Sequence, residues 1–291
     1  TQSKVKRMNI YTDYIENIRT AIASDRRGVN LSESLSGVND YVQKGMTLQA
    51  LRSQAAKKEL LPSMENFAGE LGMKINLEQQ LGLHPDFAHL KGTLATESHY
   101  IASMFIDIKG STNLFKRYNP ETVFVITNTI QKAAIHTCLI FGGYIHRLQG
   151  DGLFVYFGRK GMDKSTAVLN ALKGSSVFSY FVKHDLREVF NEQGIEDIYT
   201  RIGLDLGYDR DVVWALAGIG EISEVTTCSL HTSLASKMQG NAVSNGIVIG
   251  DNIKSEVSGL QEYFTPVCHR TKNEKDRYIF RIPEEAFNYT Q

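Results

Sequence analysis

Two aspartates have the character of metal ligands because each one ends or interrupts an apolar stretch. Asp107 closes the run SMFIDI, and Asp151 lies between two glycines in the segment GGYIHRLQGDGLFVYFG. A carboxylate at the end of a buried strand is costly unless a cation accompanies it. An Asp-Gly step alone indicates only a tight hairpin turn. Together with the backbone carbonyl of Ile108, however, the two carboxylates form a set of hard oxygen ligands suited to Mg²⁺ or Mn²⁺.

A short polar loop follows the first aspartate directly. Its residues Lys109, Gly110, Ser111 and Thr112 precede a predicted helix, so their backbone N–H groups are expected to bind phosphate oxygens. Two divalent ions held close together can activate an attacking hydroxyl and stabilise a leaving phosphate. The loop and the aspartates therefore predict a nucleoside triphosphate site with two metal ions.

The elements that must position these residues alternate between strands and helices from about residue 98. The segment NPETVFVITNTIQKAAIHTCLIFGG predicts a helix that Asn119 caps, that Pro120 begins and that Gly142 ends. YIHRLQGDGLFVYF predicts two strands folded back through the Asp-Gly turn, and YTRIGLDLG with VVWALAG predicts another strand pair. The order β-α-β-β-α-β is that of a ferredoxin-like or palm core, so we expect an α+β fold.

Composition limits the classes of function and the location. Lys plus Arg and Asp plus Glu both number 32, so no overall charge draws the chain to nucleic acid or to an anionic membrane. Three scattered cysteines and the absence of a long apolar run predict a cytoplasmic protein. Residues 1–96 are predicted to form a helical segment for dimerisation or regulation, and residues 97–291 the catalytic domain.

The paired motifs resemble those of the class III nucleotidyl cyclases, the family of adenylate and guanylate cyclases. FIDIKGST is similar to the first family signature and GGYIHRLQGDG to the second, within a resemblance that covers roughly residues 98–282. The resemblance implies conversion of a nucleoside triphosphate into a 3′,5′-cyclic monophosphate and pyrophosphate. It also implies a homodimer with shared active sites, in which one protomer supplies the metal-binding Asp107, Ile108 and Asp151 and the other supplies the residues that recognise the base.

The candidate base-recognition residues depart from the pattern of the members that use ATP. Where those members carry Lys and Asp, this chain has Arg147 and Thr226. The combination is most similar to the pyrimidine cyclases of the bacterial antiphage system called Pycsar, which make cyclic UMP or cyclic CMP. Because uracil presents two carbonyls to a donor such as Arg147, UTP is favoured over CTP. Tyr100 or Phe105 on the first strand is a candidate to stack on the base.

A second departure lies on the short helix SLHTSLASKMQ. The family usually carries Asn and Arg four residues apart, and the corresponding residues here are Ser233 and Lys237. Their spacing puts them on one helical face, where they can stabilise charge on the α-phosphate. Lys237 lacks the bidentate geometry of Arg, which predicts slower chemistry. Arg210 and Lys272 are further candidates to bind the polyphosphate.

Two other functions remain open at this level. A purine cyclase with unusual base-recognition residues would carry the same metal ligands. A catalytically silent cyclase-like module would explain Ser233 and Lys237, but it has no need for two facing carboxylates. His146 precedes Arg147 on the predicted strand, so strict alternation places the two side chains on opposite faces. We therefore expect His146 to be a packing or surface residue.

Overall fold

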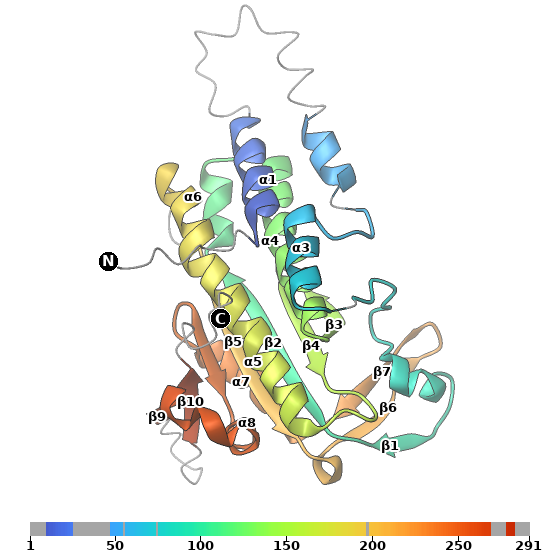
Figure 1. The fold of residues 1–291 in the computed structure, drawn as a ribbon. Helices are drawn as coiled ribbons and strands as arrows, with labels where there is room; N and C mark the ends of the chain where they lie inside the picture. Colours follow the sequence, from blue (N-terminus) through green and yellow to red (C-terminus); the bar gives the residue numbers. More distant parts are fainter. Residues whose placement is uncertain are drawn as a thin grey trace, which may run out of the picture.

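The computed structural model describes residues 10–25, 47–54, 56–73, 75–195, 198–268 and 278–282 (Figure 1). The strands are β1 (Thr96–Ser98), β2 (Ile101–Lys109), β3 (Tyr144–Gln149), β4 (Gly152–Phe157), β5 (Tyr199–Gly207), β6 (Val213–Ile219), β7 (Ile222–Cys228), β8 (Gly246–Ile249), β9 (Thr265–Cys268) and β10 (Tyr278–Ile282). The α-helices are α1 (Thr12–Ala23), α3 (Pro62–Glu70), α4 (Pro120–Ile140), α5 (Lys164–Tyr180), α6 (Arg187–Glu192), α7 (Leu230–Asn241) and α8 (Asp251–Glu256). Residues 47–54 are also helical. The 3₁₀ turns are η3 (Pro85–Leu90), η4 (Ser111–Lys116), η6 (Asp209–Asp211) and η7 (Ser258–Tyr263), and the π-helical segment η5 (Phe181–Leu186) joins α5 to α6.

A seven-stranded sheet with the order β3-β4-β2-β5-β8-β10-β9 organises the fold. The elements β2, α4, β3, β4, α5 and β5 follow one another as predicted, which confirms the α+β class. The predicted pairing of β5 with β6 is wrong. β5 pairs with β2 and β8, whereas β6 pairs with β1 and β7 in a separate three-stranded sheet. The turn η6 directs the chain out of the main sheet between the two strands.

The alternation of side chains along β2 divides the main sheet into two faces. Met104 and Ile106 belong to the large apolar cluster that contains the buried residues of α4 and α5. Ser103 and Asp107 lie on the opposite face, where they contact α7. α4 is long and apolar enough to span a membrane by composition alone, but 72% of that window is buried inside the fold, as in a core helix.

A glycine on β5 lets α7 lie directly on the sheet. A Cβ atom at Gly203 would come within 2.1 Å of the carbonyl oxygen of Ala235 and 2.2 Å of the backbone nitrogen of Gln239. Any side chain there would push the helix away from β5. Close packing of α7 is therefore what places Gln239 against the end of β2.

The N-terminal helices pack against the same core as the rest of the chain. The Tyr14 hydroxyl is 2.6 Å from Nδ1 of His136 on α4, and the ring of Tyr11 stacks on Phe181 at 4.1 Å. Both tyrosines belong to the apolar cluster that lines the main sheet. The domain boundary at residue 96 stays a prediction. The helix α1 nevertheless packs into the same apolar cluster as β2 and β4, the strands on either side of the site.

Candidate active site

The fold brings the two predicted metal-binding aspartates to neighbouring strands. Asp107 lies near the end of β2, and Asp151 lies at the turn between β3 and β4. The antiparallel register pairs Ile106 with Leu153, so Asp107 stands beside Gly152, the residue after Asp151. A Cβ atom at Gly152 would be 2.4 Å from the carbonyl oxygen of Ile106. The second glycine of the Gly-Asp-Gly turn is thus needed for the close approach of the hairpin to β2.

The Asp107 carboxylate is held by three donors. Its Oδ2 lies 3.0 Å from a guanidinium nitrogen of Arg201, 3.0 Å from the Gln239 amide nitrogen and 3.0 Å from the Lys109 ammonium. Burial alone would raise the pKa of Asp107. The hydrogen bonds and charges of Arg201 and Lys109 outweigh burial, so this pKa lies below its ordinary value. Asp107 is therefore ionised at neutral pH, as a metal ligand must be.

The Asp151 carboxylate is tied to the phosphate-binding loop that the sequence predicts. The Ser111 hydroxyl donates to its Oδ2 at 2.5 Å, and Gly110 precedes it with a φ of 89° that favours glycine. The Gln131 side chain on α4 donates to the backbone carbonyls of Gly150 and Gly152, which holds the hairpin turn in place. Asp151 is therefore joined to the Gly110–Ser111 loop, and Asp107 lies on the strand beside the hairpin turn.

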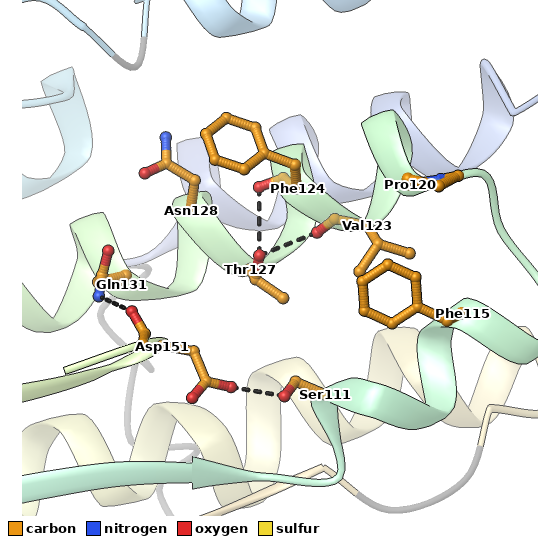
Figure 2. Close-up of a pocket in the computed structure, with 10 residues that line it drawn as sticks. Ser111, Phe115, Pro120, Val123, Phe124, Thr127, Asn128, Gln131 and Asp151 are labelled. Carbon is orange, nitrogen blue, oxygen red and sulfur yellow. Dashed lines mark hydrogen bonds between the residues drawn. The ribbon is translucent and has the colours of Figure 1, made fainter.

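A pocket of about 420 Å³ opens beside Asp151, between η4, α4 and the hairpin turn (Figure 2). Ser111, Gln131 and Asp151 line its polar end, and Phe115 and Val123 lie at its apolar end. Pockets that combine apolar walls with a few converging polar groups are common at small-molecule sites. Thr112 on the same loop is exposed.

The residues present fit a pair of divalent cations. The available metal ligands are hard oxygen atoms. The close approach of Gly152 to the backbone of β2 keeps the two aspartates on adjacent strands. Within the described ranges, no group of three or more His, Cys, Asp or Glu side chains gathers at one point. A bound ion would therefore complete its shell with backbone carbonyls such as that of Ile108, with water and with phosphate oxygens, as Mg²⁺ usually does.

The candidate base-recognition residues lie on facing strands of the two sheets. Arg147 on β3 forms an ion pair with Glu224 on β7, in which Nε donates to Oε2 at 2.6 Å. The Thr226 hydroxyl, two residues further along β7, lies 3.1 Å from Nε2 of His146. Arg147 and Thr226 are thus brought close to one another, and Glu224 is the partner that sequence reasoning missed.

The prediction that His146 and Arg147 point to opposite faces is wrong. A bulge shifts the register of β3 between Ile145 and Arg147, so both side chains reach toward β7. His146 is fully buried, and burial together with Arg147 and His84 lowers its pKa to about 3. The imidazole is therefore neutral at physiological pH.

Two candidates lie away from the aspartates within one protomer. Tyr100 precedes β2 at the end opposite Asp107, and its buried ring donates its hydroxyl to the Met162 carbonyl at 2.5 Å. Arg210 lies in η6 beyond the end of β5, near Tyr100, and pairs with Asp211 at 3.6 Å. The stacking role of Tyr100 and the polyphosphate role of Arg210 are therefore not supported within a single chain. Lys272 lies outside the described residues.

Phe105 is the other stacking candidate, and it lies closer to Arg147. Its ring stacks on Phe154 at 4.2 Å, and Phe154 is the cross-strand partner of Arg147. Phe105 is only 7% exposed, so its ring belongs chiefly to the core.

Ser233 and Lys237 both lie on the exposed side of α7, while Ala235 and Met238 face inward. Their roles at the α-phosphate stay predictions, and a partner protomer could reach them.

A buried ion pair fixes the start of α7. Nδ1 of His231 lies 2.8 Å from Oδ2 of Asp205, a residue of β5 that is 2% exposed. Burial raises the pKa of the Asp205 carboxyl above its ordinary value, although His231 acts in the opposite direction. The pair therefore links the β5 strand to the helix that carries Ser233 and Lys237.

Replacing His231 with alanine is expected to lower the free energy of unfolding by about 3 kcal/mol at pH 7, because Asp205 then stays buried without a cation. The variant raises the folded-state pKa of Asp205 further. A raised carboxyl pKa weakens the folded state as pH rises through the interval between the unfolded and folded values. Urea unfolding should therefore show a larger loss at pH 7 than at acidic pH. An equal loss at both would contradict the assignment of the pair.

Comparison with solved structures identifies the fold. The chain has the fold of the class III nucleotidyl cyclase catalytic domain, which confirms the predicted resemblance. It matches the adenylyl cyclase CyaB from P. aeruginosa with a TM-score of 0.57 and 20% identity, over 65% of this chain and 96% of that one. It matches the guanylyl cyclase Cya2 with a TM-score of 0.53 and 17% identity, over 64% and 92%.

Sequence comparison finds relatives whose names give a more specific activity. The chain is 40% identical over 204 residues to a cytidylate cyclase of Staphylococcus aureus, covering 70% of this chain and 48% of that protein. It is 31% identical over 260 residues to a cytidylate cyclase of Escherichia coli, covering 84% and 54%. The chain thus spans about half the length of these curated relatives. No protein-family model matches it.

Proposed function

We propose that this protein is a nucleotidyl cyclase that converts a pyrimidine ribonucleoside triphosphate into its 3′,5′-cyclic monophosphate and pyrophosphate. The observation that carries the proposal is the placement of Asp107 and Asp151 on adjacent strands, with Ser111 of the phosphate loop bonded to the second. The names of its relatives support CTP as the substrate. We therefore propose CTP in place of the UTP that the sequence predicts.

The chemistry is an in-line attack of the ribose 3′ oxygen on the α-phosphorus, with pyrophosphate as the leaving group and the 3′ proton released to solvent. Two Mg²⁺ or Mn²⁺ ions bound by Asp107, Asp151 and the Ile108 carbonyl would make the hydroxyl a better nucleophile and neutralise the leaving phosphate. Arg201, Lys109 and Gln239 orient the Asp107 carboxylate and keep it ionised.

Several of the other predicted residues act on the nucleotide itself. Backbone N–H groups of Gly110, Ser111 and Thr112 bind phosphate oxygens, and Arg147, which lies close to Thr226, binds the base. Ser233 donates to the ribose or the α-phosphate, and Lys237 places positive charge near it.

We propose a homodimer with two equivalent shared sites. Ser233 and Lys237 are exposed on α7, which leaves them accessible to a second protomer. The β6–β7 hairpin also ends in apolar side chains, with Ile219 77% and Ile222 81% exposed. Neighbouring exposed apolar side chains of this size are typical of a protein contact. Figure 1 shows this hairpin at the side of the main sheet, away from α1.

A product assay tests the proposal. The purified protein is incubated with equimolar ATP, GTP, CTP and UTP and with Mn²⁺, and the products are identified by mass spectrometry. Cyclic CMP is the expected main product. If cyclic UMP is the main product instead, the preferred substrate is UTP. Only cyclic AMP or cyclic GMP would show a purine cyclase, and nucleotide binding without any cyclic product would show a silent module. A role in antiphage defence and a cytoplasmic location stay predictions from the resemblance and the composition.

A further inference from the structure

The guanidinium of Arg147 forms an ion pair with the carboxylate of Glu224 in the same chain. Glu224 accepts from Nε at 2.6 Å through Oε2, and its Oε1 contacts a terminal nitrogen of the same guanidinium. This side-on pair fixes the plane of the guanidinium and leaves its other N–H groups available. Arg147 is 46% exposed and Glu224 20%, so both still reach the surface.

A strap formed by residues 80–84 holds Glu224 in this position. The strap lies between β3 and β7, because the Gly82 N–H donates to the His146 carbonyl at 2.9 Å and the Gly82 carbonyl accepts from Val225 at 2.8 Å. A Cβ atom at Gly82 would come within 2.8 Å of the Cβ atom of Glu224, and the φ of Gly82 is 68°. Glycine is therefore required at this point of the strap, and the position of Glu224 is built into the backbone.

The polar groups next to the Arg147–Glu224 pair are neutral. His146 is buried with a pKa lowered to about 3, and Nε2 of its ring meets the Thr226 hydroxyl. The same hydroxyl lies 3.4 Å from that of Tyr156, which is 2.8 Å from the Thr227 hydroxyl. Thr226 is thus engaged in an internal chain of hydroxyl groups. Among the residues described around Arg147, Glu224 supplies the charged acceptor.

We infer that Glu224 determines base specificity by accepting a hydrogen bond from the exocyclic amine of cytosine, while Arg147 donates to the adjacent ring nitrogen or carbonyl. The inference rests on the proposed function, because it concerns the base of the same substrate. In the fixed pair, the Arg147 guanidinium is a donor and the Glu224 carboxylate beside it is an acceptor. This order matches cytosine, whose N3 accepts a hydrogen bond and whose neighbouring amine donates one. Uracil presents the reverse order, N3–H beside a carbonyl, so its O4 would face the carboxylate and be repelled.

The test is the ratio of kcat/KM for CTP to kcat/KM for UTP in the variant Glu224→Gln. The amide keeps the size of the side chain but can donate to O4 as well as accept from an amine. We expect the CTP to UTP ratio to fall at least about 10-fold, as on losing one specific hydrogen-bond pair. Glu70→Gln, at an exposed position at the end of α3, is the control and should leave the ratio unchanged.

The outcomes separate this inference from the proposed function. If the wild type makes no cyclic pyrimidine product, the proposed function itself fails. If the wild type makes cyclic CMP and Glu224→Gln lowers both kcat/KM values equally, Glu224 only anchors Arg147 and the inference is overturned. If the variant has too little turnover to measure, the ratio of equilibrium affinities for the two triphosphates, measured with Ca²⁺ in place of Mn²⁺, gives the same decision.

Discussion

Replacing Asp151 with asparagine is expected to reduce the rate of cyclic nucleotide formation at least about 10³-fold, because the variant removes a charged ligand of the ions that stabilise the transition state. Asparagine keeps the volume of the side chain and is well tolerated in a tight turn. Its amide oxygen can still accept from the Ser111 hydroxyl, which now bonds the Asp151 carboxylate at 2.5 Å. The loss should therefore be one of chemistry and not of folding.

The rate is measured with CTP and Mn²⁺ by mass spectrometry, beside the thermal unfolding temperature of each variant. Glu70→Gln, which removes an exposed carboxylate at the end of α3, is the control and should match the wild type. An Asp151→Asn protein that keeps more than about a tenth of the wild-type rate, well short of the loss of a metal ligand, would contradict the assignment.

Two inactive variants are expected to restore activity when they share a dimer. A protomer with Asp151→Asn keeps Lys237, and a protomer with Lys237→Ala keeps both aspartates. If each site takes its metal ligands from one protomer and Lys237 from the other, the mixed dimer contains one intact site and one doubly altered site. Its rate should then be about half that of the wild-type dimer.

Co-expression with two different affinity tags and sequential purification isolates the mixed dimer for this assay. Each variant alone serves as the control, because its homodimer contains no intact site. Failure to recover a complex with both tags would contradict the homodimer. A recovered mixed dimer no more active than the average of the two homodimers would show that Lys237 and Asp151 do not share a site across the interface.

The strands and the turn that carry the two aspartates were predictable because their signals are local. An apolar run that ends in Asp107 and an Asp-Gly turn after an apolar strand both act over a few residues, and the structure confirms both elements. The helix α4 begins at Pro120 and is followed by Gly142 with a φ of 74°, as its sequence indicates, but the side chain of Asn119 makes no capping hydrogen bond. Backbone preferences of proline and glycine fix such boundaries without help from distant parts of the chain.

The supporting residues could not be predicted because they come from distant elements. Gln239 lies 132 positions from Asp107 in the sequence, and Glu224 lies 77 from Arg147. Only the packing of α7 against Gly203 and of the strap against β7 brings them into contact. His146 was misplaced for another reason: alternation assumes a regular strand, and the bulge in β3 breaks that period.

Equilibrium binding of Mn²⁺ tests most directly whether Asp107 and Asp151 hold cations together. Binding is followed by electron paramagnetic resonance in the presence of a CTP analogue that cannot cyclise, for the wild type and for the variants Asp107→Asn, Asp151→Asn and both combined. We expect either single variant to weaken Mn²⁺ binding nearly as much as the double variant does, because the two carboxylates serve one site. Independent, additive losses, or wild-type binding in the double variant, would contradict it.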